Sequence, residues 1–481
     1  MKRFSDTLSV MMLSLLGFVL ALAILVGAVQ GESNFVAFIC ALPVIFIFFR
    51  FFHKKDLCTY WNKLGVIKIS IILVVSCFLI HFLYICIFTL EPVNDYYRFW
   101  TTSISLAQQM PVDDPRYLAV FPHILGYSSF LSLFMRFGGT SPMLAAILNV
   151  FFTTFSGLII YILAFRWFGL SAALFSFIIW ILCPSKMMYN SMVLSDPYYT
   201  FFILVFILIL DCLRCKIMNS HWSLIAFTAF LCGVCLVVVN AARPIAAIPI
   251  IAFLLWLFLL RETDLHNKVL WKKWLVFTVV LLLVYFEGGK LWNSYVTNIV
   301  GEDVSTIPSY NIAVGFNTDS GGSYSSDDMK LLHYYIDEVG LTAVQAQEKM
   351  MALAESRITS GRLSFLELLV KKLQTFLGSD GFAAWYTKDI LSKPIYYITK
   401  IMSDVYYYFL AMLVLYAIAC PLRKSPTNVC YIVPMYVLGL TLAQMLVEVA
   451  GRYHYSIIPM LILIAASNEE RQLKCCAYDC D

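Results

Sequence analysis

The sequence predicts an all-α polytopic membrane protein with about twelve transmembrane helices. Of its 481 residues, 61% are hydrophobic and only 13% are charged, and the mean hydropathy is +0.80. An average soluble protein carries roughly 25% charged residues, so a soluble globule of this size could not cover its surface. These values exclude a soluble enzyme, a disordered chain and a secreted disulfide scaffold. The net charge of +4 is small, and no nucleic-acid partner is predicted.

Apolar runs of about 20 residues, the length that crosses a bilayer as a helix, recur along the whole chain. Lys2 and Arg3 precede the first run, which lacks a small-residue cleavage site, so we expect an uncleaved span and not a signal peptide. The predicted spans are 8–27, 34–52, 67–90, 141–165, 168–184, 197–213, 222–240, 244–260, 274–290, 404–420, 429–447 and 455–468.

The stretch 117–137 decides the orientation of everything after it. It contains Pro122, His123 and Gly126 and suits a helix lying in the interface better than a span. If it does not span, the basic short loops all fall on one side, as the positive-inside rule requires. Both termini are then cytoplasmic. The basic residues that agree are Lys2, Arg3, Lys54, Lys55, Lys63, Arg166, Arg214, Lys216, Arg261, Lys268, Lys272, Lys273, Arg423, Lys424, Arg471 and Lys474.

Two loops of substance then face outward. The first, 91–140, includes the interfacial helix, and the second, 291–403, is far longer than an ordinary connection. Within the second we expect a polar loop at 317–328 and helices at 328–339, 342–358 and 364–377. None of the 14 cysteines lies in this loop, which favours a bacterial plasma membrane over a secretory compartment.

Four regions follow from this topology. They are an N-terminal transmembrane module with the first outer loop (1–290), a mostly helical extracytoplasmic loop region (291–403), C-terminal transmembrane helices (404–468) and a cytoplasmic tail (469–481).

Acids, bases and amides collect at the predicted outer ends of the spans. Because polar groups in or beside a span are costly, they are candidates for function. They come from four separate hairpins, which suggests one site at the outer surface. The residues are Asp95; Lys186, Asn190 and Asp196; Asn240 and Arg243; and Glu448, Arg452 and His454.

Each of these residues also has a structural interpretation. Asp95 could cap a short helix, and Ser195-Asp196-Pro197 is typical of a helix N-terminus. Arg243-Pro244 is expected at a helix start, where an arginine opposes the helix dipole unless an anion binds there. Tyr96 and its neighbours serve either sugar stacking or interfacial anchoring.

The residue types indicate a particular chemistry. Arginine and histidine side chains can hold a phosphate by charge-assisted hydrogen bonds, and an aspartate can accept a proton from an attacking hydroxyl or amine. No Walker loop, Rossmann glycine pattern, HExxH or GxSxG occurs in a usable context. No metal site is predicted and no cofactor is required, while a divalent metal stays an open alternative.

With these features the sequence resembles the GT-C glycosyltransferases, the polytopic group that contains protein O-mannosyltransferases and the lipid A aminoarabinose transferase. The resemblance covers roughly residues 67–290 and 404–468. It rests on Asn94-Asp95, Phe121-Pro122-His123 through Tyr127, Gly138-Gly139, Leu194-Ser195-Asp196-Pro197, Ala242-Arg243-Pro244 and Gly451-Arg452-Tyr453-His454.

The resemblance implies a GT-C-like bundle and an inverting hexosyl or pentosyl transferase. Such an enzyme moves a sugar from a polyprenyl-phosphate donor to a glycan, lipid or protein acceptor at the outer face of the membrane. It implies Asp95 as the general base and Asp196 as an acceptor- or metal-positioning residue. It implies that Arg243, Arg452 and His454 bind the donor phosphate. Candidate sugar contacts are Tyr96, Tyr97, Lys186, Asn190 and Glu448.

This chain departs from the family pattern in two ways. Two spans precede the one that leads into the Asp95 loop, whereas the family usually begins with that span. Asp95 also lacks the adjacent second acid of some relatives, which makes a metal-dependent mechanism less favoured.

Two other functions stay open. An O-antigen-type polymerase or ligase would place its key residues in 291–403, where Arg357, Arg362 and His333 are available. A lipid-linked sugar flippase or other transporter would have polar residues along a path at mid-membrane and broken helices there. The gathering of polar residues at the outer ends of spans favours the glycosyltransferase.

Overall fold

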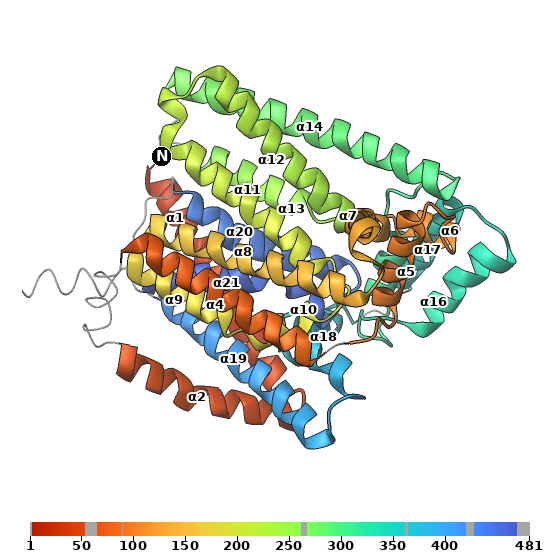
Figure 1. The fold of residues 1–481 in the computed structure, drawn as a ribbon, viewed down its shortest axis with the longest axis horizontal. Coiled ribbons are helices and arrows are strands. Elements are labelled where there is room, and N and C mark those ends of the chain that lie inside the picture. Colours follow the sequence, from red (N-terminus) through yellow and green to blue (C-terminus); the bar gives the residue numbers. More distant parts are fainter. Residues whose placement is uncertain are drawn as a thin grey trace, which may run out of the picture.

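The computed structural model describes residues 2–52, 65–88, 90–260, 267–360, 364–419 and 428–468. Within these ranges the chain forms helices and no β-strand, which confirms the predicted all-α class. The long helices run side by side, and many short helices collect at one end, on the right in Figure 1. The predicted tail 469–481 and the basic residues Lys54, Lys55, Lys63, Arg261, Arg423 and Lys424 lie outside the described residues.

All twelve predicted spans coincide with helices, so the chain is a multi-pass membrane protein. Seven segments are each long and apolar enough to cross a membrane: α1 (Lys2–Ala28), α4 (Val66–Ile87), α8 (Pro142–Phe168), α12 (Trp222–Ala242), α14 (Lys268–Val300), α19 (Lys393–Ala419) and η6 (Val429–Tyr431) continued by α20 (Ile432–Leu446). The helices α9 (Leu170–Ile181) and α10 (Pro184–Asn190) qualify together, with a 53° bend between them. The other predicted spans fall on α2 (Glu32–Phe52), α11 (Asp196–Lys216), α13 (Ala247–Leu255) with η2 (Trp256–Leu260), and α21 (Ile457–Ala465) with η8 (Ala466–Asn468).

The segments between the spans are short helices, and all of them except the turn that joins α11 to α12 lie at one end of the bundle. They are α5 (Asp95–Ala107), α6 (Pro115–Val120), α7 (His123–Gly138), η1 (Ile217–Asn219), α15 (Ser309–Gly315), α16 (Ser326–His333), η4 (Tyr334–Glu338), α17 (Ala343–Thr359), α18 (Phe365–Leu377), η5 (Gly381–Thr387) and η7 (Gly451–His454). Among them, α5, α6, α7, α16 and α17 lie at the right-hand end in Figure 1.

The ambiguous stretch 117–137 forms α6 and α7, separated at Phe121 and Pro122. Proline has no N–H to continue the first helix, and the residue before it is disfavoured in the helical region. Neither helix is long and apolar enough to cross a membrane, in agreement with the non-spanning interpretation.

Two helices extend beyond the predicted spans. The helix α14 continues ten residues past 290 to Val300, and Glu287 and Lys290 on its exposed surface pair at 2.7 Å one turn apart. It ends at Gly301, whose φ of 79° is the left-handed conformation that glycine adopts without strain. The helix α19 starts at Lys393, eleven residues before the predicted 404, because partners distant in the sequence satisfy its polar side chains.

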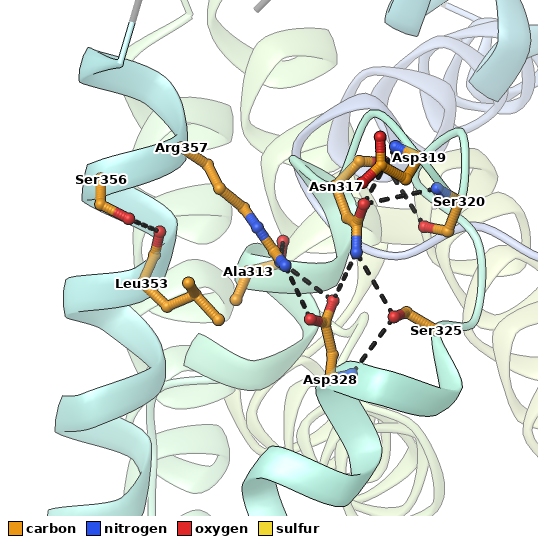
Figure 2. A network of polar contacts seen from close by, with 9 residues as sticks. All are labelled: Ala313, Asn317, Asp319, Ser320, Ser325, Asp328, Leu353, Ser356 and Arg357. Atoms are coloured by element: carbon orange, nitrogen blue, oxygen red, sulfur yellow. Dashed lines mark hydrogen bonds and ion pairs between the residues drawn. The ribbon is translucent and has the colours of Figure 1, made fainter. Parts of the chain in front are cut away.

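The long loop region contains the predicted helices, since α16 with η4, α17 and α18 match the three expected segments. A salt bridge fixes it internally (Figure 2). Arg357 on α17 donates to both carboxylate oxygens of Asp328 on α16, at 2.6 and 2.9 Å, and also to the Ala313 carbonyl at 2.7 Å. Asn317 in the predicted polar loop donates to the same carboxylate at 2.9 Å. The region is therefore a compact helical cap.

A close crossing of two backbones determines where the site residues lie. A Cβ placed on Gly126 of α7 would come within 2.0 Å of the Ala241 carbonyl oxygen near the end of α12. Only glycine permits this approach, which brings the interfacial helix against the residues that precede Arg243.

Candidate functional site

Asp95 begins α5 and faces an arginine that is 357 residues away in the sequence. Asn94 before it has φ 51° and ψ −127°, a backbone conformation outside the left-handed helical region, and the Asp95 carboxylate lies in the first helical turn, where the dipole favours it. Arg452 donates from Nη2 to Asp95 Oδ2 at 2.6 Å. The Asp95 side chain is 52% exposed and that of Arg452 only 11%. A buried cation thus holds an accessible carboxylate.

The charges around Asp95 keep it ionised. Partial burial by itself would raise its pKa, but Arg452 first and then Arg243 hold the pKa of Asp95 below its usual value. The carboxylate is therefore available as a proton acceptor at neutral pH.

Arg452 lies in η7 between aromatic rings. Its guanidinium carbon lies 5.3 Å from the centre of the Tyr96 ring, and Tyr96 packs on Tyr386 with ring centres 4.9 Å apart. A Cβ on the preceding Gly451 would come within 2.8 Å of Phe382 Cβ, so this position requires a glycine. Tyr96 is buried, whereas Tyr97 is exposed, so only the first of these two tyrosines contacts the cluster.

A second ion pair lies beside the first. Arg243 Nη1 is 3.7 Å from Oδ1 of Asp196, the first residue of α11. Tyr199 donates to the same oxygen at 2.9 Å, while the buried Oδ2 of Asp196 has no hydrogen-bond partner among the described residues. Tyr453 joins the two pairs, because its ring centre is 4.0 Å from the guanidinium carbon of Arg243 and 5.6 Å from that of Arg452.

The expectation that Arg243 begins a helix is wrong. Arg243 is the residue that ends α12, and α13 begins only at Ala247. The negative end of a helix dipole stabilises a cation, so this position does not by itself call for an anion. Similarly, Ser195 precedes α11 but its side chain makes no capping hydrogen bond.

Two further ionisable groups belong to this cluster. Burial first and then the neighbouring Arg243 lower the pKa of His123 to about 4, so its imidazole is neutral at pH 7. Glu448 accepts from Asn311 Nδ2 at 3.0 Å, and burial together with the charge of Asp95 raises the pKa of Glu448 to about 7. We define the site cluster as Asp95, His123, Arg243, Glu448 and Arg452. His123 was not among the predicted site residues, although the motif Phe121-Pro122-His123 is part of the family resemblance.

The His454 side chain contacts different partners from those of Arg452, although both residues belong to η7. It is buried, with Nδ1 2.5 Å from the Phe376 carbonyl oxygen and Nε2 2.9 Å from Asp380 Oδ1. Ser185 donates to the other oxygen of Asp380 at 2.5 Å. Burial by itself would raise the pKa of Asp380, but the hydrogen bond from His454 and nearby charge lower it. Both nitrogens of His454 thus face protein acceptors, an arrangement that ties η7 to the loop after α18.

Lys186 and Asn190 are also buried away from the site cluster. Lys186 Nζ lies 3.6 Å from the centre of the Tyr455 ring and has no hydrogen-bond partner among the described residues. Asn190 lies 2.8 Å from His81 of α4 and accepts from Thr153 of α8 at 2.7 Å. Asn190 therefore connects three helices of the bundle.

The arrangement has a definite chemical capacity. Two guanidinium groups flank one tyrosine ring and lie next to an accessible carboxylate, so the cluster can bind an anion and accept a proton beside it. No group of three or more His, Cys, Asp and Glu side chains in the described ranges could hold a metal ion. The predicted catalytic and binding roles stay predictions. The predicted site residues that lie together are Asp95, Tyr96, Asp196, Arg243, Glu448 and Arg452.

Comparisons with known proteins add a distant likeness. No family model and no curated protein matches the chain. Two crystal structures of ArnT from Cupriavidus metallidurans are similar to it. The one bound to undecaprenyl phosphate is 12% identical, with a TM-score of 0.35 over 82% of this chain and 78% of that one. The apo structure is 13% identical, with a TM-score of 0.34 over 88% and 79%. At such scores the assignment of function rests on the residues of this chain.

Proposed function

We propose that this protein is an inverting glycosyltransferase that uses a sugar donor linked to polyprenyl phosphate. The observation that carries the proposal is the pair of ion pairs bridged by Tyr453: Asp95–Arg452 at 2.6 Å and Asp196–Arg243 at 3.7 Å. These two ion pairs lie where the transmembrane helices meet the short helices that cover the bundle. This position suits a charged group that is attached to a lipid tail.

The proposed reaction needs a base and an anion site. An acceptor hydroxyl or amine attacks the anomeric carbon of the donor sugar from the face opposite the phosphate, and Asp95 takes the proton it loses. The bond between the anomeric carbon and the phosphate oxygen breaks, and its electron pair stays on that oxygen. Arg243 and Arg452 stabilise the charge that develops there, which is where preorganised cations contribute most to rate.

The other residues then have supporting roles. Asp196 orients Arg243, and the neutral His123 can donate or accept a hydrogen bond without adding charge. His454 positions η7 through Asp380 instead of binding phosphate. The chain's orientation follows the basic loops, with the site outside a bacterial plasma membrane and both termini inside.

Two of the three residues that a polymerase or ligase would use, Arg357 and His333, are paired with carboxylates within the long loop region. Arg357 is bound to Asp328, and His333 lies 2.8 Å from Asp337 on the next turn. Arg362 lies outside the described residues.

The test is the substitution Asp95→Asn in membranes supplied with lipid-linked sugar donor extracted from producing cells. We expect normal expression and loss of label transfer from the lipid fraction to acceptor. Asp114→Asn is the matched control, because Asp114 is a loop carboxylate that also pairs with an arginine, Arg98, at 3.0 Å. Full transfer by Asp95→Asn would contradict the proposal. Labelled sugar that crosses the membrane still attached to its lipid would instead establish a flippase.

A further inference from the structure

A pocket of about 390 Å³ lies beside the site cluster and is not part of it. Its wall comes from the turn between α1 and α2, the end of α18, the η5 segment and the first turns of α19. The volume falls within the range of about 300–1,000 Å³ found for small-molecule sites. The N-terminal hairpin α1–α2 forms part of the pocket wall. These two helices correspond to the spans that precede the usual first span of the family that the sequence resembles.

The lining is more apolar than polar, and it contains a single charged side chain. Lys400 is the one ionisable side chain among the lining residues apart from Tyr396, and its ammonium donates to Ser33 Oγ at 2.8 Å and Asn34 Oδ1 at 3.3 Å. Gln374 donates to the Val26 carbonyl at 2.7 Å, which leaves its amide oxygen as an acceptor. Among the described residues that line the pocket there is no carboxylate, although the buried Asp404 carboxylate interacts electrostatically with Lys400. The pocket therefore offers hydroxyl and amide partners and a cation.

Aromatic faces complete the lining. Trp385 is 39% exposed, and Tyr396 and Phe382 are partly buried beside it. Flat aromatic rings together with amide and hydroxyl groups fit the apolar faces and hydroxyl edges of sugar rings, whereas a lipid tail would need a uniformly apolar lining.

The pocket adjoins the site cluster through a short chain of rings. Phe382 packs on Tyr386 with ring centres 5.8 Å apart, and Tyr386 packs on Tyr96 at 4.9 Å. Gly451, which lines the pocket, directly precedes Arg452. A ligand in the pocket would thus lie next to the residues that hold Asp95.

We propose that this pocket binds the acceptor and that the acceptor is a saccharide carrying an anionic group, such as a uronate or a sugar phosphate. The aromatic rings and amides bind the sugar, and Lys400 binds the anion. This assignment rests on the proposed function, since it names the acceptor class for the same reaction.

The test measures direct binding, so it does not depend on catalysis. The full-length protein in lipid nanodiscs is titrated with glucose, glucuronate and glucose 6-phosphate, and binding is followed by saturation-transfer NMR. We expect the two anionic sugars to bind about tenfold more tightly than glucose, the effect of one charge-assisted hydrogen bond. Binding should persist in Asp95→Asn, so a failure of the proposed chemistry would leave this result intact.

Two matched pairs of variants locate the binding. Trp385→Ala should weaken all three sugars about tenfold, and Lys400→Gln should abolish the preference for the anionic ones. Tyr397→Ala and Lys393→Gln serve as controls, because both residues are exposed on α19 and neither lines the pocket. In wild-type protein, bound glucuronate should also protect Lys400 from acetylation, a measurement that needs no variant.

Three results would overturn the proposal. They are no saturation transfer from any of the sugars, equal loss of binding in the control variants, and displacement of bound glucuronate by dodecyl phosphate at lower concentration than by glucose 6-phosphate. The last result would identify a lipid-phosphate site.

Discussion

Replacing Arg452 with glutamine removes the cation that holds Asp95 while leaving a side chain of similar length. The structure makes two consequences separable, a rise in the pKa of Asp95 and a loss of affinity for the donor phosphate. The first reports on the proton acceptor, the second on the anion site.

The magnitude follows from the geometry of the pair. A hydrogen bond to a charged group contributes about 1.5–3 kcal/mol, whereas an exposed ion pair contributes about 0–1 kcal/mol. Arg452 is 11% exposed but Asp95 is 52% exposed, so solvent screens half of the contact. We therefore take about 1.4 kcal/mol for the contact, which corresponds to about tenfold in an equilibrium constant.

The direction of the effect is fixed by the sign of the shift. Arg452 lowers the pKa of Asp95, so the basic form persists to lower pH in the wild type. In Arg452→Gln the acidic limb of the profile of kcat/KM against pH should move to higher pH. The assay is label transfer from the lipid-linked donor across that pH range.

Arg98→Gln is the control, because Arg98 makes a comparable pair with Asp114 at 3.0 Å in the same loop. An acidic limb that stays in place in Arg452→Gln, or that moves equally in Arg98→Gln, would refute the reasoning.

Two further perturbations test neighbouring contacts. Because burial and Asp95 raise the pKa of Glu448 to about 7, Glu448 gains charge as pH rises through neutrality. Affinity for polyprenyl phosphate should fall severalfold from about pH 6 to about pH 8, and Glu448→Gln should abolish that fall in a binding titration. Arg357→Met leaves the buried Asp328 unpaired and should destabilise the helical cap by about 2 kcal/mol, less than a fully buried pair because Arg357 is 22% exposed. Limited proteolysis at 309–360 measures this, and unchanged protection would contradict it.

The fold class could be predicted from the sequence because apolar runs and basic loops are each recognisable within a short stretch of the chain. All twelve predicted spans coincide with helices, and the stretch 117–137, predicted not to span, is divided into two helices at Phe121 and Pro122. The helical extensions of α14 and α19 were not predicted, because the spans were assigned from apolar runs and these two helices continue into segments that contain polar residues. In α19 the partners of Lys400 are Ser33 and Asn34, more than 360 residues away.

The site cluster was only partly predictable for a related reason. Asp95 and Arg452 were identified because charges at the ends of spans are costly, and the fold joins them. The same rule selected His454, whose partner Asp380 lies in the segment after α18, where no site residue was predicted. His123 carried no such signal, because a histidine in an interfacial helix is unremarkable until Asp95 and the two arginines surround it.

The most direct test of the central claim is a double-mutant cycle on the binding of a polyprenyl phosphate to the protein in nanodiscs. If Arg243 and Arg452 grip one phosphate, Arg243→Gln and Arg452→Gln should each weaken binding by about tenfold or more. The loss of affinity in the double variant should then be much smaller than the product of the two single losses, because a single remaining arginine already binds the phosphate weakly. Strictly multiplicative losses, or no loss in either single variant, would show that the two arginines serve separate purposes.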